Sequence, residues 1–110
     1  MSKPKQYEVI WTETAKRDLV EIIEYISTDS ISSAKKIANK IRQRAQRLES
    51  LPTRGRWVPE LQEIGVFIYR ELIEKPWRIT YRVEQDKVYI TGVLDSRRDL
   101  EAILLERILR

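Results

Sequence analysis

The sequence predicts a small α+β fold in which a helical hairpin packs on one face of an antiparallel β-sheet. Two amphipathic helical patterns follow one another in the first half of the chain, and strand patterns with very short links fill the second half. The chain has 110 residues, of which 42% are hydrophobic, enough for one compact core. We therefore expect one domain over residues 1–110, with the element order β-α-α-β-β-β-α.

The first half of the chain predicts a short strand and two helices. Residues 7–11 are rich in β-forming side chains, Thr12 is a typical helix N-cap, and Asp29-Ser30 forms a polar break. The first helix repeats its apolar residues at helical spacing: Ala15, Leu19, Ile22, Ile23 and Ile26. The second helix does the same: Ala34, Ile37, Ala38, Ile41, Ala45 and Leu48. Because the break is short, the two helices should form an antiparallel hairpin.

The second half predicts a loop, three strands and a final helix. Residues 52–59 have the Pro and Gly content of a loop, whereas residues 66–73, 77–84 and 88–94 have strand patterns. The middle strand alternates apolar residues with polar ones: Trp77, Ile79, Tyr81 and Val83 against Arg78, Thr80, Arg82 and Glu84. Strands joined by such short links must be antiparallel. Residues 99–110 predict a helix that is apolar on more than one side, so it could offer a partner surface or simply fray at the chain end.

Several kinds of catalytic and metal site are excluded by composition. The sequence has no histidine and no cysteine, so Cys/His metal sites, Ser-His or Cys nucleophile pairs and imidazole acid/base catalysis are excluded. Its three glycines, Gly55, Gly65 and Gly92, are isolated and form no phosphate loop. We expect no metal and no cofactor. The remaining arginines, lysines, tyrosines and carboxylates could still bind phosphate.

No apolar run is long enough to cross a membrane, and residues 1–6 are polar and lack the apolar stretch of a signal peptide. We therefore expect a cytoplasmic protein.

Basic residues are concentrated in the middle of the chain. From Lys35 to Arg56 eight lysines and arginines stand against one acid, Glu49, while the whole chain carries a net charge of only +4. The candidate binding residues on the second helix are Lys36, Lys40, Arg44 and Arg47. This basic face could attract nucleic acid or an acidic protein segment, or it could be an ordinary solvated face.

Further arginines are expected on the sheet and in the preceding loop. If the strands pair as predicted, five guanidinium groups could gather on one side of the sheet: Arg70, Arg78, Arg82, Arg97 and Arg98. Alternatively, Arg82 pairs with Glu71 or Glu84, and Arg97-Arg98 is a solvated turn. In the loop, Arg54 and Arg56 flank Gly55 beside Trp57, which is typical of a nucleic-acid contact unless Trp57 lies in the core.

Several strings, in this order and spacing, resemble toxins of the RelE/ParE superfamily. They are Trp11-Thr12-Glu13-Thr14-Ala15 with Asp18-Leu19 and Tyr25-Ile26, then Tyr69-Arg70-Glu71-Leu72, Pro76-Trp77-Arg78-Ile79-Thr80-Tyr81-Arg82-Val83 and Val93-Leu94-Asp95-Ser96-Arg97-Arg98-Asp99-Leu100-Glu101. The resemblance covers nearly the whole chain. It implies a microbial-RNase-like fold and the toxin of a type II toxin–antitoxin module, as in plasmid stabilisation proteins. It also implies a cognate antitoxin that wraps over the toxin in a hetero-oligomer.

The superfamily contains two kinds of toxin. RelE-like toxins cut mRNA on the ribosome with two lysines, two arginines and a tyrosine, whereas ParE-like toxins inhibit DNA gyrase. Arg78 and Arg98 match the two arginines and Arg70 stands for one lysine, so these three are the catalytic residues if the chain is a metal-independent endoribonuclease. The remaining lysine and tyrosine positions fall at Leu72 and near Leu104. The resemblance therefore favours a gyrase inhibitor over an mRNA interferase, with a non-toxic nucleic-acid-binding domain as the lesser alternative.

Overall fold

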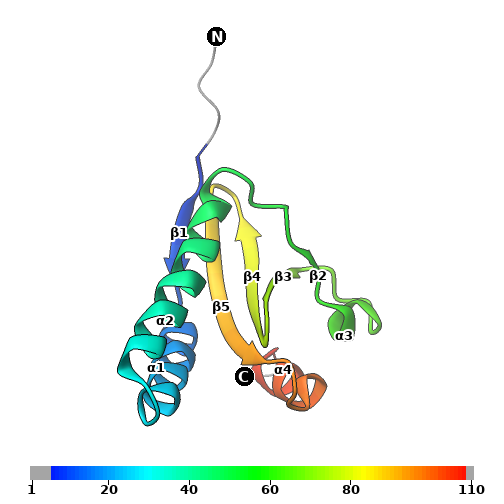
Figure 1. The fold of residues 1–110 in the computed structure, drawn as a ribbon. Helices are drawn as coiled ribbons and strands as arrows, with labels where there is room; N and C mark the ends of the chain where they lie inside the picture. The colour runs from blue at the N-terminus through cyan, green and yellow to red at the C-terminus, as the bar shows by residue number, and fades with distance from the viewer. Residues whose placement is uncertain (1–5, 109–110) are drawn as a thin grey trace.

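The computed structural model describes residues 6–108, and within them the predicted element order is confirmed in outline (Figure 1). The elements are β1 (Glu8–Trp11), α1 (Glu13–Ser27), α2 (Ile31–Gln46), the 3-10 turn η1 (Arg47–Glu49), β2 (Arg56–Trp57), α3 (Pro59–Gln62), β3 (Tyr69–Glu74), β4 (Trp77–Glu84), β5 (Lys87–Asp95) and α4 (Leu100–Ile108). The predicted continuation of the last helix over Leu109 and Arg110 lies outside the described residues. No helix of the described chain is long and apolar enough to span a membrane.

The helical hairpin forms as the sequence predicts because both helices carry their own N-caps. The Thr12 hydroxyl accepts a hydrogen bond from the amide of Ala15 at 3.2 Å and begins α1. In the polar break, the Ser30 hydroxyl accepts from the amide of Ser33 at 3.1 Å and begins α2. The two helices lie side by side against one face of the sheet (Figure 1).

The sheet is mixed, which corrects the predicted fully antiparallel arrangement. Its strand order is β1-β5-β4-β3-β2, and the β2–β3, β3–β4 and β4–β5 pairs are antiparallel. The first strand pairs with the last in parallel, with Glu8 opposite Lys87 and Trp11 opposite Ile90. Short links determine the direction only of strands adjacent in sequence, and β1 reaches β5 through the whole helical hairpin.

Residues 52–68 differ most from the prediction. Part of the predicted loop pairs as β2 and continues into the short helix α3, while Val66 and the two residues after it precede the strand, which begins only at Tyr69. Pro59 stands at the start of α3, where its missing amide hydrogen costs nothing. Both elements are too short to leave a periodic pattern in the sequence.

The two faces of the sheet carry two separate cores. The hairpin face buries a large apolar cluster: Ala15, Leu19, Ile41, Ala45, Leu48, Leu72, Ile79, Tyr81, Val88, Ile90 and Val93. The opposite face buries a smaller one with α3 and α4: Val58, Leu61, Leu94, Leu100 and Leu104. A register shift opposite Thr80 and Tyr81 leaves Thr91 as an extra residue on β5, so that Val88 and Ile90 before it and Val93 after it all face the hairpin-side core.

Candidate functional site

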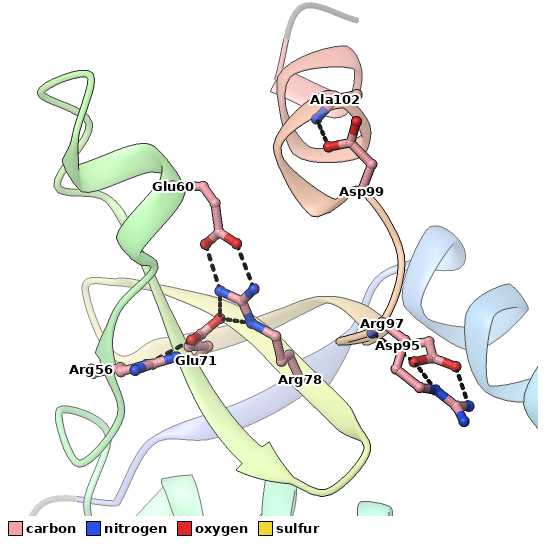
Figure 2. A network of polar contacts seen from close by, with 8 residues as sticks. All are labelled: Arg56, Glu60, Glu71, Arg78, Asp95, Arg97, Asp99 and Ala102. Carbon is pink, nitrogen blue, oxygen red and sulfur yellow. Dashed lines mark hydrogen bonds and ion pairs between the residues drawn. The ribbon is translucent and has the colours of Figure 1, made fainter.

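The face of the sheet opposite the hairpin carries an ion-pair network centred on Arg78. Figure 2 shows its guanidinium between two carboxylates, Glu60 from α3 and Glu71 from β3. Its Nη1 and Nη2 donate to the two Glu60 oxygens at 2.6 Å each, and its Nε donates to Glu71 Oε1 at 2.7 Å. Arg56 Nε donates to the other Glu71 oxygen at 2.7 Å. Two cations therefore meet two anions, and the network is neutral.

Hydrogen bonds between opposite charges hold this network in its charged form, against the desolvation that burial imposes on each group. The Arg78 side chain is 9% exposed and the Glu71 side chain 0%, whereas the Glu60 side chain retains 26%. Hydrogen bonds with the Glu60 carboxylate raise the pKa of Arg78, and the same bonds lower the pKa of Glu60. A phosphate could approach the Arg78 guanidinium only by displacing one of these carboxylates.

Arg70 lies on the other face of the sheet from Arg78. The register places Arg70 opposite Tyr81, a residue of the hairpin-side core, and places Arg78 opposite Ile73. The guanidinium of Arg70 lies 3.9 Å from the ring centroid of Trp57 and donates to the Gly55 carbonyl at 2.8 Å. The alternation of β3 separates the two arginines, so the expected gathering of five guanidinium groups on one face does not form.

The other sheet arginines pair locally. Arg82 forms an ion pair with Glu84, which was one of the alternatives, and its guanidinium stacks 4.3 Å from the Tyr89 ring centroid. Arg97 donates from two nitrogens to the carboxylate of Asp95 at 2.9 and 2.6 Å, and these bonds lower the pKa of Asp95 to about 2 (Figure 2).

Arg98 is exposed, and no ion pair or side-chain hydrogen bond involves it within residues 6–108; its backbone amide donates to the Asp95 carbonyl.

The basic residues of α2 and of the following loop divide into paired and unpaired groups. Lys40 and Arg44 both lie 3.7 Å from Glu74, and Arg44 also donates to a backbone carbonyl at the open edge of β3. Arg56 is paired in the Arg78 network. Three other candidates are exposed and have no carboxylate partner among the described residues: Lys36, Arg47 and Arg54.

Trp57, the aromatic neighbour of these loop arginines, is half-buried. It lies neither in the core nor fully open, because Phe67 covers it edge-on at 6.0 Å between ring centroids.

A cavity of about 250 Å³ lies between the sheet and α4. It is lined by Thr12, Thr14, Leu61, Tyr69, Thr80, Thr91, Leu104, Arg107 and Ile108. Arg107 donates to both oxygens of Asp18 at 2.9 Å, so its charge is compensated inside the cavity. A side chain at Gly92 would collide with this pair, since an added Cβ would lie 2.7 Å from Arg107 Nη1.

Glu60, Asp18 and Arg107, which form these ion pairs, were not among the site residues predicted from the sequence. Asp18 had a signal, because it falls three residues after Ala15 on the apolar stripe of α1, where a carboxylate must find a partner. Glu60 had none, since it lies in a four-residue helix within a stretch without periodicity.

Comparisons of the sequence and of the fold with known proteins identify the family of this chain. The profile of the family described as "ParE toxin of type II toxin-antitoxin system, parDE" matches residues 9–100. A structure of the chromosomal ParDE toxin–antitoxin system from P. aeruginosa is similar with a TM-score of 0.68 and 22% identity, covering 83% of this chain and 97% of that one. The toxin–antitoxin complex RelBE2 from Mycobacterium tuberculosis gives a TM-score of 0.63 and 21% identity, covering 86% and 97%. No curated protein sequence matches. The family match extends over most of the chain, and the chain therefore belongs to the ParE toxin family of type II toxin–antitoxin systems.

Proposed function

We propose that this toxin arrests growth by binding and inhibiting DNA gyrase, without a catalytic centre of its own. The observation that carries the proposal is the pairing of Arg78, whose guanidinium donates hydrogen bonds to the carboxylates of both Glu60 and Glu71. A ribonuclease needs cations free to stabilise charge that develops on a phosphate. An inhibitor that acts by occupying a surface needs no such group.

The remaining positions of the ribonuclease set support the same conclusion. Leu72 stands where the second lysine would act, and Leu104 lies near the position of the tyrosine; both are buried, in the two opposite cores. Arg70 and Arg78 point to opposite faces of the sheet, so they cannot hold one phosphate together with Arg98. The alternative of a ribosome-dependent endoribonuclease using these three arginines is therefore the weaker proposal.

The test compares two activities of the same protein. Purified toxin is added to DNA gyrase and relaxed plasmid, and loss of supercoiling with rising toxin concentration is expected. In parallel, the toxin is induced in cells and transcripts are mapped by primer extension. Cuts phased with codons, together with unimpaired supercoiling, would overturn the gyrase proposal in favour of the endoribonuclease.

A cognate antitoxin is the second partner that we propose. Both structural relatives are toxin–antitoxin systems, one of them solved as a complex. Lys36 on α2 and Arg47 directly after it leave uncompensated positive charge, to which an acidic antitoxin segment would be attracted. Such a segment would mask the toxin in a hetero-oligomer. Because gyrase is a cytoplasmic target, we place the toxin in the cytoplasm.

A further inference from the structure

The loop between α3 and β3 exposes an unusual amount of apolar surface. Ile64, Phe67 and Ile68 are 53%, 53% and 58% exposed, and all three lie within five residues of one another. Single exposed apolar side chains are ordinary, but a contiguous group of large ones marks a site of protein contact. In Figure 1 α3 and this loop lie at the margin of the molecule, away from the α1–α2 hairpin.

Two further side chains extend this surface through direct contacts. The Phe67 ring contacts the Trp57 ring edge-on, with 6.0 Å between ring centroids. The Arg70 guanidinium stacks on the Trp57 ring, 3.9 Å from its centroid. Stacking of this kind fixes the orientation of both Trp57 and Arg70 before any partner arrives. Tryptophan and arginine are the residues that most often dominate binding energy at interfaces. We call Trp57, Ile64, Phe67, Ile68 and Arg70 the aromatic tip.

The charge of Arg70 is left uncompensated within the described chain. Its side chain donates to two backbone carbonyls, those of Gly55 at 2.8 Å and Thr53 at 3.4 Å, and no carboxylate pairs with it in residues 6–108. Arg54, in the same loop, is exposed and also lacks a carboxylate partner there. This contrasts with the arginines of the Arg78 network, which are neutralised. A partner of the aromatic tip should therefore bring carboxylates as well as apolar surface.

We infer that the aromatic tip is the surface that docks on the target enzyme, a folded protein offering an apolar recess bordered by carboxylates. The inference rests on the proposed function and names the part of the toxin that would carry it out. A projecting loop with a preformed aromatic anchor suits a concave site on a large folded protein. An acidic antitoxin segment would find its complement on α2, where the surface is basic rather than apolar.

The experiment replaces tip residues and measures two interactions. The double variant Phe67→Ser/Ile68→Ser changes only exposed side chains, so the fold should persist, as a thermal melt would verify. We expect the toxin concentration that halves gyrase supercoiling to rise on the order of tenfold or more. Binding to the protein encoded by the reading frame adjacent to the toxin gene should stay within about twofold, because the tip lies outside the basic α2 surface. Arg54→Glu should weaken inhibition most at low salt.

The matched control is Val20→Ser/Ile31→Ser, which removes apolar side chains of 50% and 66% exposure from the hairpin and should leave inhibition unchanged. If the wild-type toxin does not inhibit gyrase, the proposed function fails. If the wild type inhibits and the tip variant inhibits equally well, only the assignment of the tip is wrong. Loss of antitoxin binding in the tip variant, with or without loss of inhibition, would also overturn the assignment and make the tip an antitoxin contact.

Discussion

At the scale of single residues, Arg78 depends on carboxylates that come from two separate elements. Glu71 contributes from within the sheet and is fully buried, whereas Glu60 arrives from α3 and retains some exposure. Removing one member of such a network leaves a buried charge without its partner, and that costs far more than losing an exposed ion pair. The network thus fixes α3 on the sheet as well as neutralising Arg78.

Replacement of Glu71 tests this dependence. Glu71→Gln keeps the shape of the side chain but removes the charge that Arg78 and Arg56 share, and we expect unfolding free energy to fall by about 3 kcal/mol. Glu84→Gln, which breaks the exposed pair with Arg82, should cost less than about 1 kcal/mol. Urea denaturation of both variants measures the difference. Equal losses in the two variants would show that the buried network contributes no more than a surface pair.

The lowered pKa of Glu60 predicts a dependence of stability on pH. Because the folded protein holds Glu60 ionised below its ordinary pKa of 4.5, the unfolded chain binds more protons there. The contribution to stability is therefore complete above pH 4.5 and is lost as the pH falls through the folded-state pKa. Glu60→Gln should flatten the decline in melting temperature between about pH 5 and pH 3. Asp95→Asn should act at lower pH, since the pKa of Asp95 is lowered to about 2. Identical profiles for wild type and Glu60→Gln would refute the coupling.

At the scale of elements, a helix or strand could be predicted when its apolar pattern ran over many residues and its partner lay close by in the sequence. The hairpin and the β3–β5 meander were predictable because their apolar periodicities run over many residues and their links are short. The parallel direction of β1 was not, because four residues at the sheet edge carry no information about a partner strand far along the chain. The same limit applied to the site: the arginines could be named, but their carboxylate partner Glu60 sits in α3, which has no periodic signal.

The last helix depends on a contact that sequence periodicity does not reveal. Arg107 of α4 binds Asp18 of α1, and Asp18 also accepts a hydrogen bond from the Val93 amide of β5 at 3.0 Å. Arg107→Met keeps much of the apolar stem but removes the charged bonds, so α4 should detach more often. Hydrogen exchange at α4 amides should accelerate by on the order of tenfold, since each 1.4 kcal/mol lost changes the opening equilibrium by that factor. Arg97→Met, just before α4 and exposed, is the control and should leave exchange unchanged. Equal exchange in the two variants would mean that apolar packing alone holds the helix.

At the scale of the whole molecule, two kinds of surface lie apart. The apolar aromatic tip lies beside α3, whereas the unpaired cations Lys36 and Arg47 lie on α2 and on η1 directly after it. Figure 1 shows α2 and α3 well separated. A toxin that must bind both an antitoxin and a target gains from such a separation, because one partner can be recognised by charge and the other by apolar contact. On the functions proposed above, long-range electrostatic attraction would speed capture by the antitoxin, and apolar contact would provide affinity for the target.

Charge reversal on α2 tests this separation. Lys36→Glu/Arg47→Glu should weaken binding to the antitoxin on the order of tenfold at low salt and make that binding less dependent on ionic strength, because the attraction it removes is screened by salt. Inhibition of gyrase should change little, since neither residue touches the aromatic tip. Lys75→Glu/Lys87→Glu changes the net charge equally, at an exposed turn and at the exposed first residue of β5, and separates a local effect from a global one. If the α2 variant loses gyrase inhibition while antitoxin binding is retained, the basic helix contacts the target and not the antitoxin, and the proposed assignment of the two surfaces is wrong.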